Sequence, residues 1–383
     1  MYSRHTHRFL YTLLLLSLFA CTASRKISQV ESLIKGLRLI GQYEIPYNFQ
    51  FRNTTVGGLS GIDYDARRDQ YYLICDDRSD KNPARYYVAK IHVSSQAIDS
   101  VAFTGVTYMR QPDGNLYPNS KQDPLRTPDP EAMRYDPKTN TLAWTSEGER
   151  ILGATGNILE DPAVYFIDMV GKFIDSLGLP ANLKMRTEAK GPRRNGTLEG
   201  ICYADNYQTL YVSVEEPLFE DGPSADTQEN NAYTRIYKFD VKTRQCMAQY
   251  AYKLSPVAYP AVPENAFKIN GIPDILSLGK NKLLVIERSF STGRLPCTIK
   301  LFVADLAGAT DISNQSLLNP GSFVPATKSL LLNMDDLGIY TDNIEGVTFG
   351  PNLPNGHKTL LFIADNNFNP LEKAQVLLFE VLE

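Results

Sequence analysis

The sequence predicts an all-β fold, a β-propeller of five blades, from two patterns that recur in the same order along the chain. The first occurs about every 70 residues, as GGLSGIDYD (57–65), PDPEAMRYD (128–136), TLEGICYAD (197–205), GIPDILSLG (271–279) and NIEGVTFGP (343–351). The second is an apolar run after each of these that ends in one or more acids, such as YYLICDD and TLLFIAD. A polar turn separates the two patterns, as in a β-hairpin. Such units cannot bury their own faces, so we expect them to stack around an axis.

The remaining strands complete the blades. A third strand is expected in most units, as in RYYVAKIHV and TRIYKFDV, and a fourth in DSVAFTGVTYM and CMAQYAYKLS. The last unit shows only three strands, and the segment 37–46, LRLIGQYEIP, is a spare strand that could close the ring and remove the exposed edges. Five blades are favoured, and a sixth, irregular blade within 100–125 or 305–340 is the alternative. The even repeat disfavours a pair of β-sandwiches.

The N-terminal segment predicts export. Arg4 and Arg8 precede an apolar run from Leu10 to Ala20, the pattern of a secretory signal. This run is too short to span a bilayer as a mature helix. The residues LFAC resemble a bacterial lipobox, which implies cleavage before Cys21 and a lipid on its thiol. Ordinary secretion with a free Cys21 is the alternative.

The expected organisation is therefore a signal peptide over 1–20, a lipid tether over 21–34 and one propeller domain over 35–383. No Pro/Ser-rich linker divides that domain. The expected location is the bacterial cell envelope, either lipid-anchored to a membrane or periplasmic. The oligomeric state is not predicted.

Composition excludes several classes of function. The formal net charge is −4 and there is no basic stripe, which argues against a nucleic-acid partner. Beyond the signal peptide the only histidines are His92, in an alternating strand, and His357, in a turn, so a Ser-His-Asp triad is disfavoured. The GxSxG motif is absent. The other cysteines form no CxxC motif, which argues against zinc, and one disulfide or four free thiols remain open for Cys75, Cys202, Cys246 and Cys297.

The recurring register places acids where a metal could bind. The central positions of the first pattern are Ser60, Glu131, Glu199, Asp274 and Glu345. In a propeller the first strand of each blade lines the central channel, so these acids should gather. Like charges this close raise one another's pKa values unless a cation neutralises them, and carboxylates without His or Cys suit Ca²⁺ or Mg²⁺. Structural carboxylates bonded to backbone amides are an equally weighted alternative.

We expect Glu131, Glu199 and Glu345 to share one divalent cation, most readily Ca²⁺. Asp76 and Asp77, at the end of the first apolar run, are further candidate ligands because Ser60 replaces the acid in that unit.

Two arginines follow the second pattern: Arg78 after Asp77, and Arg288 after Glu287. A guanidinium binds phosphate and carboxylate through its planar fork. Arg78, Arg288 and Glu199 are therefore the candidate catalytic residues. Ion pairs that join neighbouring blades are the favoured interpretation of the two arginines on their own.

Six motifs in one order, GGLSGIDYD, DDRS, PDPEAM…SEGE, LEGICY, IERSF and DNIEGVTF, resemble the phytase-like family described as "esterase-like activity of phytase". The resemblance covers roughly residues 35–383. It implies hydrolysis of phosphate or carboxylic esters and a small anionic ester as substrate. It supplies no secure catalytic set, so the acids and arginines remain candidates. Propeller phytases, which this chain resembles in architecture, use calcium. The alternatives are a calcium-dependent lactonase and a non-catalytic propeller that binds a glycan or a protein.

Overall fold

The computed structural model describes residues 34–154 and 156–383. The predicted signal peptide, Cys21 and nearly all of the tether lie outside these residues. Within the described part of the chain, no helix is long and apolar enough to cross a membrane.

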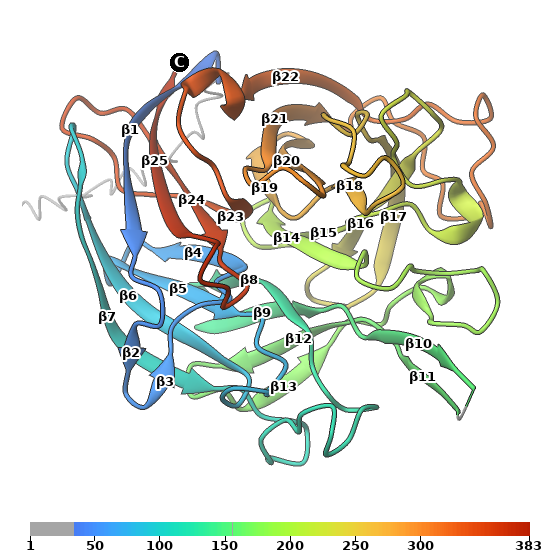
Figure 1. The fold of residues 1–383 in the computed structure, drawn as a ribbon, viewed down its shortest axis with the longest axis horizontal. Helices are drawn as coiled ribbons and strands as arrows, with labels where there is room; N and C mark the ends of the chain where they lie inside the picture. Colours follow the sequence, from blue (N-terminus) through green and yellow to red (C-terminus); the bar gives the residue numbers. More distant parts are fainter. Residues whose placement is uncertain (1–33, 155) are drawn as a thin grey trace, which may run out of the picture. The chain divides into compact units, whose positions relative to one another are not determined.

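Five sheets stand around a central axis, with the first strand of each blade nearest to it (Figure 1). The first blade is β4 (Gly61–Asp65), β5 (Gln70–Cys75), β6 (Arg85–Val93) and β7 (Ile98–Tyr108). The second is β8 (Pro130–Asp136), β9 (Thr141–Ser146), β12 (Ala163–Asp168) and β13 (Phe173–Ser176). The third is β14 (Leu198–Ala204), β15 (Thr209–Val214), β16 (Tyr233–Asp240) and β17 (Cys246–Lys253). The predicted five-bladed propeller is confirmed.

The fourth blade departs from the pattern in its first strand. Its members are β18 (Lys268–Gly271), β19 (Ile275–Gly279), β20 (Lys282–Ser291), β21 (Thr298–Asp305) and β22 (Thr327–Asn333). β18 and β19 pair with opposite ends of β20. Pro273 lies between them and has no N–H to give to the sheet, which explains why the expected single strand is divided.

The fifth blade is closed by the N-terminal strand. It contains β23 (Asn343–Phe349), β24 (Thr359–Asp365), β25 (Ala374–Leu382) and β1 (Gly36–Ile45). β1 pairs antiparallel with β25 from Gly36 opposite Leu382 to Ile45 opposite Ala374. The strand predicted over 37–46 therefore closes the ring. The segments considered for a sixth blade hold instead β7, a long loop, β22 and a short helix (Met334–Leu337).

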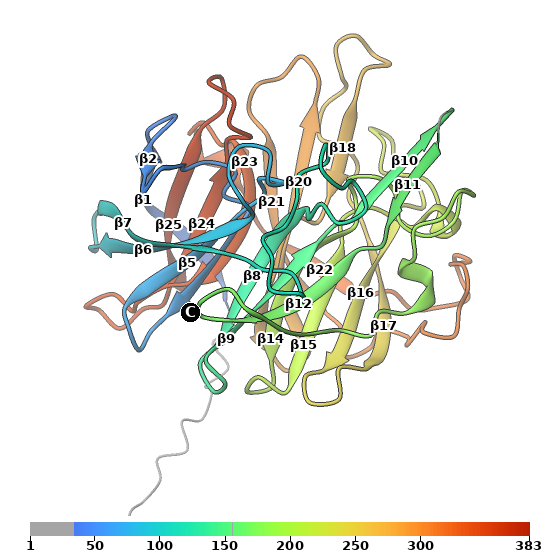
Figure 2. The ribbon, with the colours of Figure 1, turned by 90° about the horizontal axis from the view of Figure 1, so that it is seen from below.

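The core lies between the blades. Trp144 and Tyr86 are buried between the first and second blades, and Phe362 and Ile299 between the fourth and fifth. Two small hairpins, β2–β3 (Gln50–Phe51, Thr54–Thr55) and β10–β11 (Glu149–Gly153, Gly156–Glu160), stand apart from the blades. The second projects from the ring in side view (Figure 2). The four cysteines of the described residues are free thiols.

The first strands carry β-bulges at the predicted acids. The pairing register shifts at Glu131 in β8, at Glu199 in β14 and at Glu345 in β23. A bulge turns a side chain out of the regular alternation of its strand. This local feature re-aims the three carboxylates.

Small residues bring the first strands into contact beyond these acids. A Cβ added at Gly61 would lie 3.0 Å from the Cα of Ala132, and one at Gly346 would lie 3.0 Å from the Cα of Gly61. A Cβ at Gly200 would lie 2.9 Å from the Cα of Asp274. Backbones this close leave no room for side chains, so the channel is closed at this level.

Arg134 fills the channel on the far side of that closure. Its guanidinium donates to the carbonyl oxygen of Ile62 (2.9 Å), to that of Val347 (3.1 Å) and to Oδ2 of Asp274 (2.6 Å). The side chains of Arg134 and Asp274 are 3% and 0% exposed. Asp274, which shares the register of the predicted metal ligands, is therefore paired with Arg134.

Candidate functional site

Eight carboxyl groups gather where the first strands begin and the second strands end. We call this set the acid ring: Asp76, Asp129, Glu131, Glu147, Glu199, Glu215, Glu345 and Asp365. The first, second, third and fifth blades contribute carboxylates. The fourth contributes Arg288, which pairs with two of them.

The charges of the acid ring act on one another across the blades. Burial raises the pKa of Glu131 well above its usual range, and Glu199 of the third blade adds to the rise. Burial likewise raises the pKa of Asp76, and among its neighbours Glu345 of the fifth blade adds most. The blades therefore bring together groups that the sequence separates by more than 60 residues.

Three members stand closest together, and we call them the carboxylate triad: Asp129, Glu131 and Glu147. One ligand oxygen of each lies within 4.8 Å of the other two. Asp129 and Glu147 are buried, whereas Glu131 is half-buried. Three oxygen ligands at this spacing fit a hard divalent cation, so the triad could hold a metal.

Glu147 connects the triad to the third blade. Its Oε1 accepts the backbone N–H of Thr197 at 2.5 Å, and the carboxyl group of Glu199 lies close enough for each of the two to shift the other's pKa. Burial raises the pKa of Glu147 to about 7 and Glu215 adds to the rise, while the N–H of Thr197 opposes it. Two neighbouring buried carboxyl groups with raised pKa values resist ionising together, so this pair can hold a proton near neutral pH.

Both predicted arginines reach the acid ring. Arg288 donates to Oε1 of Glu215 at 2.5 Å and to Oε1 of Glu345 at 3.0 Å. Arg78 lies 3.0 Å from Oε2 of Glu149 and 3.4 Å from Oδ2 of Asp129.

These ion pairs join neighbouring blades. This agrees with the interpretation of the two arginines that the sequence favoured. The Nε atoms of Arg78 and Arg288 are nevertheless buried without a hydrogen-bond partner. Each guanidinium therefore keeps one donor that an anion could use.

Asp77 bonds to the loop that follows it and to Arg85, and it does not join the acid ring. Its oxygens accept the backbone N–H groups of Asp80 and Asn82, and Oδ2 pairs with the buried Arg85 at 2.8 Å. Ser60, at the register of the predicted acids, donates to the carbonyl oxygen of Glu131 at 2.6 Å. The structure thus brings Asp76, but not Asp77, to the acid ring.

A sequence model of the family described as "Phytase-like: Esterase-like activity of phytase" matches residues 54–368. The chain belongs to this family. A search of curated proteins finds no match for the phytase-like propeller.

Similar solved structures include the endo-arabinase from Bacteroides thetaiotaomicron VPI-5482, with 14% identity and a TM-score of 0.44 over 89% of this chain and 97% of that one. The α-L-arabinofuranosidase from Lactobacillus brevis has 10% identity and a TM-score of 0.45, over 85% and 91%. These similarities are too low to carry an argument about activity.

Sequence reasoning did not select four members of the acid ring, namely Asp129, Glu147, Glu215 and Asp365. A signal for three of them exists, because Glu147, Glu215 and Asp365 end the second apolar run of their units. These runs become β9, β15 and β24, whose ends meet at one end of the phytase-like propeller. Asp129 lies two residues before Glu131, just outside the predicted register.

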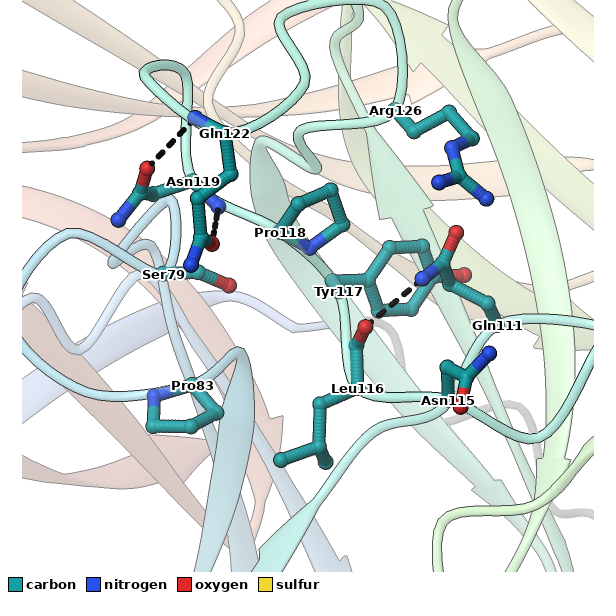
Figure 3. A pocket seen from close by; sticks show the side chains of 10 residues that line it. All are labelled: Ser79, Pro83, Gln111, Asn115, Leu116, Tyr117, Pro118, Asn119, Gln122 and Arg126. Atoms are coloured by element: carbon teal, nitrogen blue, oxygen red, sulfur yellow. Dashed lines mark hydrogen bonds between the residues drawn. The ribbon is translucent and has the colours of Figure 1, made fainter.

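A cavity of about 470 Å³ lies apart from the acid ring (Figure 3). Its walls include Ser79, Gln111, Tyr117, Asn119 and Arg126, from the loop after β5 and the long loop after β7. Several of the polar groups already bond within their own loop: Gln111 donates to the carbonyl oxygen of Leu116, and Asn119 accepts the N–H of Gln122. None of the eight carboxyl groups lines this cavity.

The metal-free phytase-like propeller is expected to lose stability as the pH rises from about 5.5 to 8.5. Folding raises the pKa of Glu147 to about 7 and of Glu345 to about 8, in both cases chiefly through burial. The folded state therefore holds more protons than the unfolded state in this window, and the free energy of unfolding falls with rising pH. Calorimetry in chelator should show a fall in Tm of about 5–10 °C. A flat or rising Tm would contradict the raised pKa values.

Proposed function

We propose that the phytase-like propeller is a hydrolase of phosphate or carboxylic esters that works at the acid ring. The observation that supports this most is the carboxylate triad, whose oxygens lie within 4.8 Å of one another. Oxygen ligands without Cys or His suit Ca²⁺, which accepts irregular coordination. The family's description, which names an esterase-like activity, agrees with the proposal.

The residues around the triad suit the chemistry of an ester. A divalent cation held by Asp129, Glu131 and Glu147 would supply polarisation of the ester oxygen and a lowered pKa of water. Arg78 lies 3.4 Å from Asp129 and has a free Nε–H, so its guanidinium can neutralise charge that develops on the substrate oxygens. Arg288, on the opposite part of the ring, can hold a further anionic group through its own Nε–H.

Glu199 is the proposed proton carrier. It lies in the ring at 7% exposure, and burial followed by the charge of Glu147 raises its pKa well above the usual range. Because Glu199 starts protonated, it can donate its proton to the leaving oxygen and then recover a proton from the attacking water. The water oxygen forms the new bond to phosphorus or carbon, and the bond to the leaving oxygen breaks.

The variant Glu131→Gln is expected to lose calcium binding at the carboxylate triad and hydrolysis together. Wild type at a calcium concentration 100 times Kd should gain about 2.7 kcal/mol of stability, which is a rise of a few degrees in Tm. We expect kcat/KM of Glu131→Gln to fall at least about 100-fold. The assay uses p-nitrophenyl phosphate, p-nitrophenyl acetate and a simple lactone, with calcium and with chelator.

Glu229→Gln is the control, because Glu229 is an exposed carboxylate paired with Lys253. It should behave as wild type. Calcium binding without any hydrolysis would favour the non-catalytic binding module, and hydrolysis of the lactone alone would favour the lactonase. Absence of any calcium response in wild type would overturn the proposed metal centre.

Export and lipid anchoring are also proposed. The support is the N-terminal pattern of a basic region, an apolar run and Cys21. Expressed in a bacterial host, the full chain should appear in the membrane fraction, and Cys21→Ser should release it.

A further inference from the structure

We propose that Asp76 and Asp365 form a second cation site, separate from the carboxylate triad, where the first blade meets the fifth. The proposal goes beyond the hydrolytic function, and its test does not require activity.

Asp365 is the observation that points to a ligand. It ends β24 and is 0% exposed, yet neither of its carboxylate oxygens has a hydrogen-bond partner. The backbone N–H groups of Asn366 and Asn367 lie near enough to oppose the rise in its pKa, but not in hydrogen-bonding geometry. Among the described residues no other carboxyl group has both oxygens buried and unbonded. A buried carboxylate without a partner is costly, so the site calls for a positive charge.

Among the described residues, no arginine or lysine forms an ion pair with Asp365. Burial raises the pKa of Asp365, and Asp76 is the neighbour that adds most. The groups that act on it most strongly are carboxylates and backbone N–H groups, and none is an arginine or a lysine. Elsewhere in the ring, Glu345 pairs with Arg288 and Asp129 with Arg78. Asp76 is acted on by Arg85, but that guanidinium is paired with Asp77. The carboxyl group of Asp365 is thus left without a cationic side chain paired to it.

The backbone around Asp76 leaves space for its oxygens. Gly58 has φ +59°, and a Cβ added there would lie 1.9 Å from Oδ1 of Asp76. The N–H of Gly58 donates to Oδ1 of Asn366 at 3.2 Å, and its carbonyl oxygen accepts from the N–H of Asp76 at 2.8 Å. Gly58 therefore ties the end of β5 to the residue after Asp365. This contact brings the carboxyl groups of Asp76 and Asp365 to the boundary between the first and fifth blades, which we call the seam.

The access and chemistry of the seam fit a small hard cation. Asp76 is half-buried, so an ion can reach it, whereas Asp365 is enclosed. Two carboxylates suit Ca²⁺, with water or carbonyl oxygens as further ligands. The competing account is a proton shared by Asp76 and Asp365, which would leave the seam without a metal.

The test counts bound calcium in three proteins at pH 7.5, by equilibrium dialysis after removal of metals: wild type, Asp365→Asn and Glu131→Gln. We expect two bound calcium ions in wild type and one in each variant. In chelator, Asp365→Asn should be at least as stable as wild type, because the change removes an unpaired buried carboxylate. The rise in Tm that calcium causes in Asp365→Asn should be smaller than the rise that it causes in wild type.

Glu160→Gln is the matched control, because Oε2 of Glu160 is also buried and unbonded but lies on β11, in the hairpin that stands apart from the blades. It should bind two ions. Should Asp365→Asn fail to fold, Asp76→Asn carries the same expectation.

Each outcome decides between the two proposed centres. One ion in wild type that Glu131→Gln loses and Asp365→Asn keeps overturns the second site and leaves the triad. One ion that Asp365→Asn loses and Glu131→Gln keeps supports the seam and overturns the triad. No bound ion in wild type overturns both, and favours the shared proton.

Discussion

Removal of residues 36–45 is expected to leave the propeller unable to fold as a soluble, cooperative unit. The deletion takes away β1, whose pairing with β25 runs from Gly36 to Ile45. Each lost backbone hydrogen bond costs about 0.5–1.5 kcal/mol, and the free energy of unfolding of a domain is only about 5–15 kcal/mol. The exposed edge of β25 would also be a template for aggregation.

β1 seals two interblade cores as well as one edge. Ile40 and Tyr43 pack against the core between the fifth and first blades, and Leu37 and Leu39 pack against the core between the fourth and fifth. The deletion therefore opens both faces of the last blade. A chain that begins at Ile34 is the control, since Ile34 packs against the second of these cores. Circular dichroism melting and gel filtration are the measurements. A soluble monomer with a normal transition would refute the closure.

Arg134→Met is expected to destabilise the protein by about 3–5 kcal/mol, the cost of breaking a buried ion pair on one side. The change leaves the carboxylate of Asp274 buried without its arginine. It also strips donors from the carbonyl oxygens of Ile62, Ile275 and Val347, which belong to three other blades. Urea denaturation should show the loss as a lower midpoint.

A double variant separates charge from packing. Arg134→Met with Asp274→Asn removes both charges, so it should recover part of the loss of the single variant. Asp274 also accepts the backbone N–H of Val347 at 2.9 Å, which Asn can still accept through its carbonyl oxygen. A loss below about 1 kcal/mol for Arg134→Met would show that the central ion pair is not a main tie between the blades.

The blades could be predicted because each carries its own copy of two local patterns. The register of Glu131, Glu199 and Glu345 was visible for the same reason, and a glycine next to two of these acids marked the bulges. Pro273 predicts the division between β18 and β19. The division was missed because residues 271–279 were aligned as one copy of the first pattern. Local patterns therefore determined the strands and the ends of the strands.

The pairings across blades could not be predicted. Arg134 lies in an ordinary strand sequence, MRYD, and its role depends on carbonyl groups from three other blades. Asp76 and Asp77 are adjacent and chemically alike, yet one joins the acid ring and the other binds Arg85 and a loop. Which carboxylate turns inward depends on how five sheets close around one axis, and no single repeat contains that information.

The direction of β1 sets which way the molecule would face. Its first residue, Gly36, lies opposite Leu382, whereas Ile45 lies opposite Ala374, after the loop that follows Asp365. The chain thus enters the propeller at the end remote from the carboxylates. If Cys21 carries the proposed lipid, this end of the propeller would be the one nearer to the bilayer. The carboxylates would then open to the aqueous side, where dissolved esters rather than lipids of the same membrane are within reach.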